Sequence, residues 1–299
     1  MIADRQGNVL VKDDAGKAQK FLYRTFIGRL LLKIITRPFL TKLVGKYKNG
    51  KRSAKGIKKF IAAHAIDMSD YESREYSSFN DFFTRKIKDG ARPVDLNPDH
   101  LVSPCDAKLS VYTADEKGEY PIKNSYYRLK DVVGEENEKK FYGGTVLVFR
   151  LSVDDYHRYS FFDSGTAEKT VKIKGVFHTV NPVATERYKV FSLNTREYTL
   201  IHTQNFGDAV YAEIGALCVG KIVNTGKTRF VRGEEKGYFE FGGSTVIVVL
   251  GKGAAIIDAD IRENAAKGYE TKVKSGEKIG EKPNQIIDDA KEYYGGRKI

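Results

Sequence analysis

The apolar and polar positions change their spacing along the chain, and this change divides it into two parts. After about residue 100, short apolar runs rich in Val, Ile, Tyr and Phe are separated by Gly, Asn and Asp, which is typical of strands. The pattern predicts strands over 109–112, 145–153, 170–173, 198–202, 209–214, 218–223, 238–241 and 245–250. Residues 53–90 have a mixed helical and loop pattern. The sequence therefore predicts an α+β fold, with a helical N-terminal segment before a mainly antiparallel β domain.

The segment from Lys20 to Arg37 predicts an amphipathic helix. Large apolar residues recur at helical spacing on one side, and Lys and Arg recur on the other. Pro38 is expected to end or kink the helix. Such a helix suits the interface of an anionic bilayer, and equally a surface helix docked on the domain with its basic residues in water. Nucleic-acid binding is disfavoured, because the basic residues alternate with large aliphatic ones.

The charge distribution strengthens this division. The chain carries a net charge of +12, yet residues 1–60 hold 11 Lys and 5 Arg against 3 Asp and no Glu. The remaining 239 residues are therefore almost neutral. The polar N-terminus predicts no signal peptide, and no apolar stretch reaches the roughly 20 residues of a spanning helix. Cys105 and Cys218 show neither metal-ligand nor disulfide spacing, which favours buried thiols in a reducing compartment.

Few residues are candidates for chemistry. His157 follows two aspartates in "DDYHRY" and could act as a general base, although a surface turn is the usual context of a single histidine. His178 precedes a turn and is interpreted as structural. Asp106, in "SPCDAKL", is typical of an Asx-turn. No metal-ligand, phosphate-loop or dinucleotide motif is present, so no metal site is predicted.

Gly243-Ser244 is the one Gly-Ser dipeptide of the chain and stands at the start of a predicted buried strand. A serine hydroxyl can attack the carbonyl of its preceding residue, given a nearby base. Glycine helps because it does not crowd the tetrahedral carbon and permits unusual backbone angles. A tight turn is the simpler interpretation, and the dipeptide alone favours it.

Seven segments that occur in one order favour attack by the serine hydroxyl over the simple tight turn. They are "SFNDFFTRKIKDGARPVD" (78–95), "SPCDAKL" (103–109), "DDYHRY" (154–159), "HTVNP" (178–182), "NTRE" (194–197), "YAEIGALCVGKI" (211–222) and "KGYFEFGGSTVIVV" (236–249). With them the sequence resembles the phosphatidylserine decarboxylases, a membrane-bound, pyruvoyl-dependent family. The match extends over most of the chain and ends in Gly-Gly-Ser-Thr.

The resemblance implies a proenzyme that cleaves itself between Gly243 and Ser244. The products would be a β chain of residues 1–243 and an α chain of 244–299 that begins with a pyruvoyl group made from Ser244. The family's Asp-His-Ser triad maps its aspartate onto Asp106 and its serine onto Ser244. Family members often have a second histidine where this chain has Ser160. His157 is therefore our predicted base, with His178 as the alternative.

The resemblance further implies decarboxylation of phosphatidylserine to phosphatidylethanolamine and CO2. Residues 1–60 would form a membrane-associating segment and 61–299 the catalytic domain. The expected location is peripheral, on the cytoplasmic face of an anionic membrane, with no nucleic-acid partner. A homo-oligomer is an open alternative. The competing functions are a pyruvoyl decarboxylase of another lipid headgroup or amino acid, and a non-catalytic membrane-binding β domain.

Overall fold

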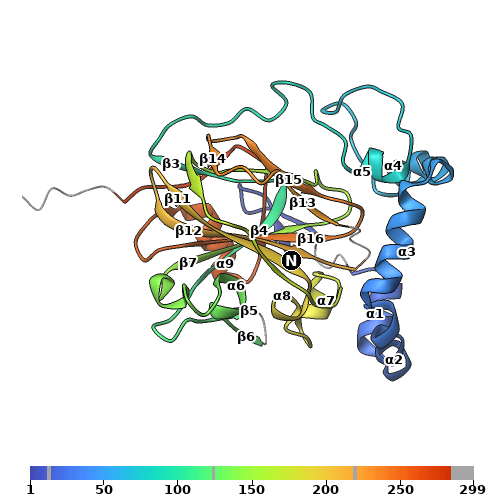
Figure 1. Cartoon of the computed structure of the whole chain (residues 1–299), viewed down its shortest axis with the longest axis horizontal. Helices are drawn as coiled ribbons and strands as arrows, with labels where there is room; N and C mark the ends of the chain where they lie inside the picture. Colours follow the sequence, from blue (N-terminus) through green and yellow to red (C-terminus); the bar gives the residue numbers. More distant parts are fainter. Residues whose placement is uncertain (12–14, 123–124, 218–220, 284–299) are drawn as a thin grey trace, which may run out of the picture.

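A computed structural model describes residues 1–11, 15–122, 125–217 and 221–283. The sheets are mainly antiparallel and the longer helices precede them, which confirms the predicted α+β fold class (Figure 1). The strands are β1 Ile2–Ala3, β2 Val9–Val11, β3 His100–Val102, β4 Ala107–Thr113, β5 Glu119–Ile122, β6 Ser125–Arg128, β7 Thr145–Leu151, β8 Arg158–Ser160, β9 Gly165–Ala167, β10 Val171–Ile173, β11 Arg196–Thr203, β12 Gly207–Gly215, β13 Ile222–Asn224, β14 Arg229–Phe230, β15 Glu235–Phe239, β16 Ser244–Leu250, β17 Ile256–Ile257, β18 Glu270–Val273 and β19 Lys278–Glu281.

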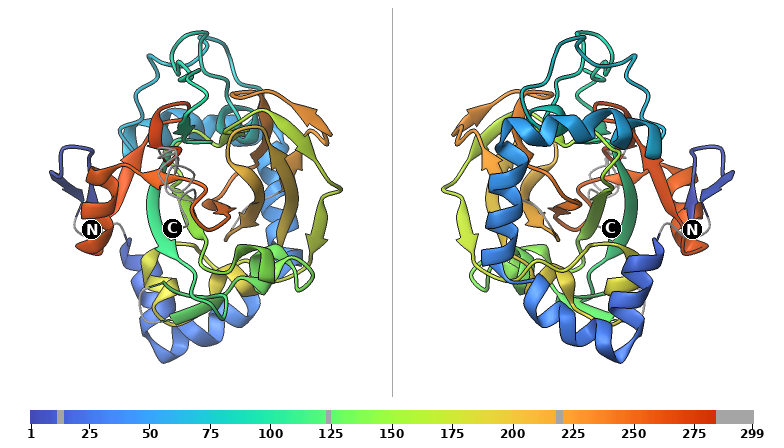
Figure 2. Two further views of the ribbon diagram at one scale, coloured as in Figure 1. Left: turned by 90° about the vertical axis from the view of Figure 1, so that its left-hand side faces the viewer. Right: turned by 90° about the vertical axis from the view of Figure 1, so that its right-hand side faces the viewer.

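The helices are concentrated in the first third of the chain. They are α1 Lys17–Arg24, α2 Phe26–Ile35, α3 Pro38–Asn49, α4 Ile57–Ala63, α5 Phe79–Phe83, α6 Lys130–Val133, α7 Pro182–Thr185, α8 Val190–Leu193 and α9 Ala259–Ala266, with 3-10 turns at Lys51–Gly56 and Glu138–Phe141. Helices α1 to α3 form a layer along one side of the sheets, drawn in blue in both views of Figure 2. Within the described residues, no helix is long and apolar enough to cross a membrane.

Strand β16 occupies the middle of the largest sheet, whose order is β14-β9-β11-β12-β16-β7-β4-β18-β1-β2, with β10 beside β11. All seven residues of β16 are buried, because the strand is paired on both edges and covered on both faces. This explains its uninterrupted apolar run from Val246. Ser244, its first residue, lies opposite Leu151 of β7 and Gly215 of β12.

The predicted single helix over Lys20–Arg37 is wrong in one respect, because the helix is interrupted at Thr25. Thr25 is extended, with φ −96° and ψ 157°, and its hydroxyl caps α2 by accepting a hydrogen bond from the Gly28 amide. The backbones of α1 and α2 then meet at Gly28, where a Cβ atom would lie 2.2 Å from the Phe21 carbonyl oxygen. Pro38 is the first residue of α3, as its fixed φ favours.

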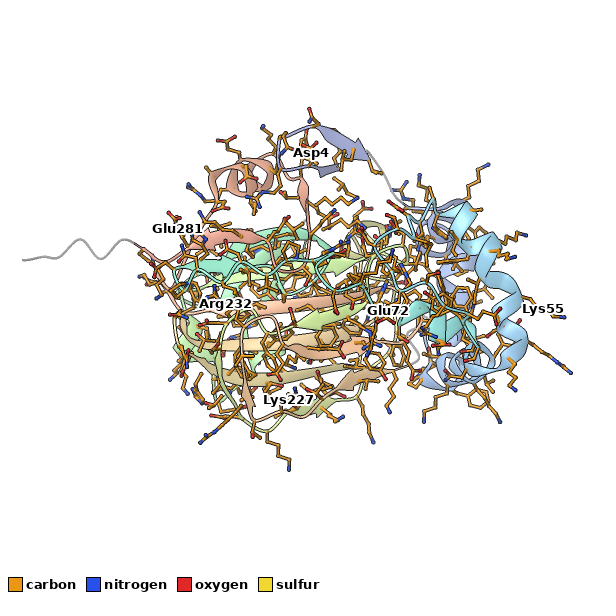
Figure 3. The ribbon with its side chains drawn as sticks, turned by 90° about the horizontal axis from the view of Figure 1, so that it is seen from above. Asp4, Lys55, Glu72, Lys227, Arg232 and Glu281 are labelled. Atoms are coloured by element: carbon orange, nitrogen blue, oxygen red, sulfur yellow. The ribbon has the colours of Figure 1, made fainter. Side chains whose placement is uncertain are left out.

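The apolar side chains of this layer divide into two sets. Tyr23 and Leu32 are buried against the body of the protein. The larger set is exposed and comprises Phe21, Phe26, Ile27, Leu30, Leu31, Ile34, Phe39, Leu43 and Tyr47. Lys55, just beyond α3, lies at the outer edge of the same layer and points away from the sheets (Figure 3). The layer is thus docked by a few side chains and leaves an apolar, basic surface uncovered.

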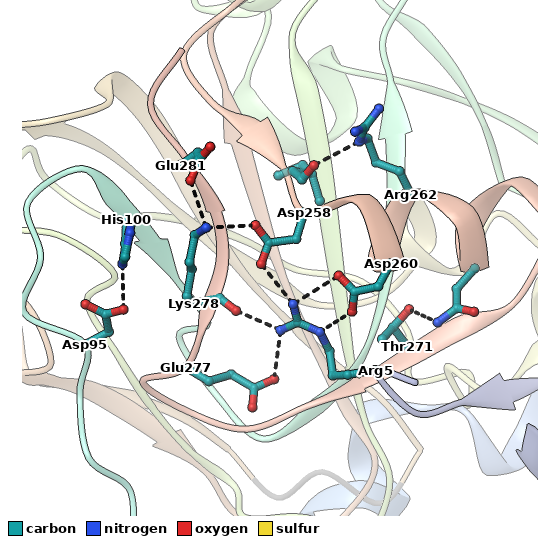
Figure 4. A network of polar contacts seen from close by, with 12 residues as sticks. Arg5, Asp95, His100, Asp258, Asp260, Arg262, Thr271, Glu277, Lys278 and Glu281 are labelled. Atoms are coloured by element: carbon teal, nitrogen blue, oxygen red, sulfur yellow. Dashed lines mark hydrogen bonds and ion pairs between the residues drawn. The ribbon is translucent and has the colours of Figure 1, made fainter. Parts of the chain in front are cut away.

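The first residues of the chain pack on the sheets rather than on the helices. Strand β1 pairs in parallel with β18, and Arg5 binds Asp258, Asp260 and Glu277 on the C-terminal part of the chain (Figure 4). The Arg5 guanidinium also donates to the Lys278 carbonyl at 2.7 Å. Residues 1–243 and 244–283 are therefore joined by strand pairing and by ion pairs, independently of the peptide bond between them. The hydrophobic pattern alone did not predict β1 and β2.

Most predicted strands are confirmed with shifts of a few residues at their ends. They correspond to β4, β7, β10, β11, β12, β15 and β16. The prediction over 218–223 is met by β13, which begins at Ile222, while 218–220 lie outside the described residues. Cys105 is fully buried, as expected, and Cys218 also lies outside the described residues.

Candidate active site

The Gly243–Ser244 peptide bond joins a turn to a rigid strand. Gly242 adopts φ +139°, a conformation that L side chains rarely reach, so the turn entering β16 requires glycine there. Ser244 is completely buried, and its Oγ has no hydrogen-bond partner among the described residues. An unpartnered buried hydroxyl costs about 1–3 kcal/mol, which marks this position as one where packing alone does not explain the residue.

His157 lies beside this turn. Its backbone carbonyl accepts a 3.0 Å hydrogen bond from the Phe239 amide, which fixes the loop after β7 to the strand that leads into the turn. The ring is fully buried against Phe83, with centroids 4.0 Å apart. Nδ1 lies 2.9 Å from the Asp155 carbonyl oxygen, which can only accept, so Nδ1 carries the proton. Nε2 is then the unprotonated nitrogen, and it has no hydrogen-bond partner among the described residues.

The surroundings of His157 keep its ring neutral. Burial, followed by the positive charge of Arg85, lowers the pKa of His157 to about 3. The carbonyl of Asp155 and the backbone of Gly242 oppose this lowering only in part. A neutral imidazole with a bare Nε2 is the form of histidine that accepts a proton.

Asp106 is held by other partners than His157. Arg92 binds its carboxylate through Nε and Nη2, at 3.0 and 2.8 Å, and the Ser275 amide donates to it at 2.8 Å. Among the contacts of the described residues, none joins Asp106 to His157. The carboxylate nearest to His157 in sequence, Asp155, is instead paired with Lys108 at 2.6 Å. The structure thus places Asp106 in an ion-pair cluster with Arg92, which also binds Asp70 at 2.8 Å.

The two other candidates have local roles in the structure. His178 stacks on Tyr188 at 4.6 Å, and its Nδ1 lies 3.2 Å from the Tyr23 hydroxyl. Burial lowers the pKa of His178 as well. Ser160 donates from Oγ to the Pro104 carbonyl at 3.2 Å, so it ties β8 to the "SPCDAKL" segment.

A cavity of about 420 Å³ opens beside the turn. Phe241, Gly242 and Gly243 form one wall, and residues 150–154 and 179–181 form the others. Gln19 of α1 also lines it, so the helical layer contributes directly to the cavity. A space of this size, next to a buried serine and a neutral histidine, is large enough for a small polar headgroup.

Two residues near the site, Arg85 and Arg92, were not predicted from the sequence. Both lie in the segment at 78–95 that carries the family resemblance, and that segment was the available signal. An arginine in a polar stretch is usually exposed, so its pattern gave no indication of burial.

The fold is a β-rich one in which a buried serine and a buried, neutral histidine lie at the turn that enters a central strand. A model of the phosphatidylserine decarboxylase family matches residues 79–281. The chain is 47% identical to "Phosphatidylserine decarboxylase proenzyme 2" of Clostridium acetobutylicum, over 88% of this chain and 91% of that protein. It is 42% identical to the phosphatidylserine decarboxylase proenzyme of Clostridium novyi, over 88% and 92% of the two chains. The chain belongs to the phosphatidylserine decarboxylase family and is a carboxy-lyase.

Proposed function

We propose that this chain is a proenzyme that converts its own Ser244 to a pyruvoyl group and then decarboxylates phosphatidylserine to phosphatidylethanolamine and CO2. One observation carries the proposal: Ser244 Oγ and His157 Nε2 are both buried with no hydrogen-bond partner in the part of the chain that the structure describes, and both lie at the turn whose Gly242 and Gly243 line the cavity. The proenzyme names of the relatives support the same processing.

Self-cleavage uses the groups already present. Ser244 Oγ attacks the Gly243 carbonyl carbon, and His157 Nε2 accepts the hydroxyl proton. The bond between the Gly243 carbonyl carbon and the Ser244 nitrogen then breaks and His157 returns the proton to that nitrogen, so the amide becomes an ester. Elimination then removes the α proton of Ser244 and breaks its Cβ–Oγ bond, which leaves dehydroalanine at position 244 and releases residues 1–243 with a new carboxylate on Gly243. Hydrolysis of the remaining dehydroalanine releases ammonia and leaves the pyruvoyl group at the start of the α chain.

The site fits such a group. Position 244 is anchored by β16, which keeps its pairing with β7 and β12 after the bond before it is broken. The cavity lies directly beside it. A pyruvoyl group supplies an electron sink for the electron pair left when CO2 departs. The protein's own residues exclude water, hold the headgroup, and return a proton, for which the buried His157 is our candidate.

The test is chemical. The purified protein should consist of two chains, the smaller of which reacts with a carbonyl reagent and begins at residue 244. Vesicles containing phosphatidylserine should yield one CO2 for each phosphatidylethanolamine formed. A single unreactive chain of 33.6 kDa would contradict the proposal and favour a non-catalytic domain.

We also propose that α1 to α3 bind the surface of an anionic membrane. The exposed apolar set of this layer, together with the basic excess of residues 1–60, is typical of a surface that enters the lipid interface. Tyr23 connects this layer to the cavity wall, since its hydroxyl accepts from the Thr179 amide at 3.0 Å. Gln19 of α1 lines the cavity itself, so the layer that we propose for membrane binding also borders the site. Binding from the cytoplasmic face stays a prediction.

Replacing Phe26, Ile27 and Ile34 together by serine should weaken binding to phosphatidylserine vesicles at least about tenfold. These side chains are 77%, 64% and 60% exposed, so their loss removes membrane contact without opening the core. Vesicle sedimentation at rising salt measures both the apolar and the electrostatic contribution. Leu96→Ser with Val231→Ser is the matched control, because both are exposed apolar residues on other segments, at 75% and 61%. Equal vesicle binding by the two variants would show that the helical layer is not the membrane-binding surface.

A further inference from the structure

Arg85 is a buried cation that the proposed chemistry does not use. Its side chain is completely buried, two residues after α5. Its Nε and Nη2 have no hydrogen-bond partner within the described ranges of the chain, and Nη1 makes one long bond of 3.4 Å to the Phe82 carbonyl. No carboxylate among the described residues forms an ion pair with it. Burying an unpaired charge costs several kcal/mol, so a fold that keeps one there needs a reason beyond packing.

Aromatic rings hold the guanidinium in place. Its central carbon lies 4.1 Å from the ring centre of Tyr71 and 4.7 Å from that of Phe82. These contacts recover part of the desolvation cost without neutralising the charge. The positive field of Arg85 therefore remains available to its other neighbours.

The chain places this charge beside His157. Phe83, two residues before Arg85, packs against the His157 ring in a tilted arrangement, and Arg158 donates from Nε to the Thr84 carbonyl at 2.9 Å. Residues 83–85 and 157–158 thus run side by side. Lys108 of β4 also lowers the pKa of the His157 ring, after Arg85 in size, and it is bound in an ion pair with Asp155 at 2.6 Å. Arg85 is the uncompensated charge of this set.

We propose that Arg85 is a positioning residue whose buried, unpaired charge keeps the His157 imidazole neutral, so that its Nε2 can accept the Ser244 proton. This inference rests on the proposed self-cleavage for its purpose, while the electrostatic effect itself can be measured in an uncleaved chain. It is consistent with the direction in which Arg85 shifts the pKa of His157.

The direct test is a histidine titration by NMR in the full chain carrying Ser244→Ala, which holds the precursor intact. With Arg85 present, the His157 ring should stay neutral from pH 8 down to about 5. Arg85→Gln removes the charge and should raise the titration midpoint of His157 by about one pH unit or more. Arg85→Lys keeps the charge and should leave the midpoint close to its original value. Equal midpoints in the Gln and Arg chains would overturn the proposal.

A second measurement needs no substitution and covers the case in which Arg85→Gln does not fold. The self-cleavage rate of the unaltered chain, followed after cell-free synthesis at different pH values, should not fall between pH 8 and 5.5. A loss of rate with a midpoint near 6.5, the ordinary pKa of histidine, would contradict the proposal. A chain that never cleaves would contradict the proposed processing instead, and the NMR titration would still decide the role of Arg85.

Discussion

Ser244→Ala should leave a single chain of 33.6 kDa with no decarboxylase activity and no reactive carbonyl. The substitution removes the attacking oxygen and leaves the backbone of β16 unchanged. It should not destabilise the fold, because the deleted hydroxyl is buried with no partner among the residues that the structure describes, and its removal relieves a desolvation cost of about 1–3 kcal/mol. Denaturing gels, intact mass and CO2 release measure the three expectations.

Thr245→Val is the matched control for Ser244→Ala. Thr245 is the next residue of β16, is equally buried, and also has an unpartnered hydroxyl among the described residues. Valine has nearly the same shape, so this variant should cleave normally. If Ser244→Ala were cleaved at the same position, Ser244 would not be the nucleophile. If Thr245→Val also failed to cleave, the loss of cleavage would come from a disturbed strand rather than from the missing serine hydroxyl.

The sequence predicted the strand that carries the site because its apolar run is continuous. Val246 to Leu250 face buried surroundings on both sides, and such runs have few alternatives to a buried strand.

The helix interruption at Thr25 was not predictable from the apolar spacing, because that spacing continues across Thr25. It depends on a side-chain cap and on the contact of two helix backbones at Gly28, and neither affects the periodicity.

Side-chain partners were the least predictable feature of the site. The motifs indicated Asp106, His157 and Ser244, but Asp106 pairs with Arg92, which only the folded chain brings to it. The burial of Arg85 arises from rings at Tyr71 and Phe82, while its own neighbours in sequence are polar. Which charge faces which ring is a property of tertiary packing, so spacing along the chain does not encode it.

His157→Ala should stall self-cleavage, with a loss of about a hundredfold or more in rate, because it removes the neutral acceptor of the Ser244 proton. Asp106→Ala should also slow cleavage, through a different route. It removes one of the two carboxylates that bind Arg92, leaves Asp70 as the other, and frees the Ser275 amide, so it disturbs the packing of the α chain near the site. The two variants should therefore differ in stability: Asp106→Ala lowers the melting temperature of the uncleaved chain, and His157→Ala changes it less.

His178→Ala is the control that distinguishes the two histidines. His178 stacks on Tyr188 and contacts Tyr23, so its loss should loosen α1 while cleavage proceeds. The cleavage half-time of each purified or freshly synthesised chain, read on gels beside a carbonyl-trapping assay, gives the comparison. Normal cleavage in His157→Ala together with absent CO2 release would confine His157 to the decarboxylation step. Stalled cleavage in His178→Ala alone would transfer the base to His178. If cleavage of His157→Ala is slow and added imidazole restores its rate, the missing group is the imidazole itself. A small base can occupy the space that the substitution leaves beside Phe83.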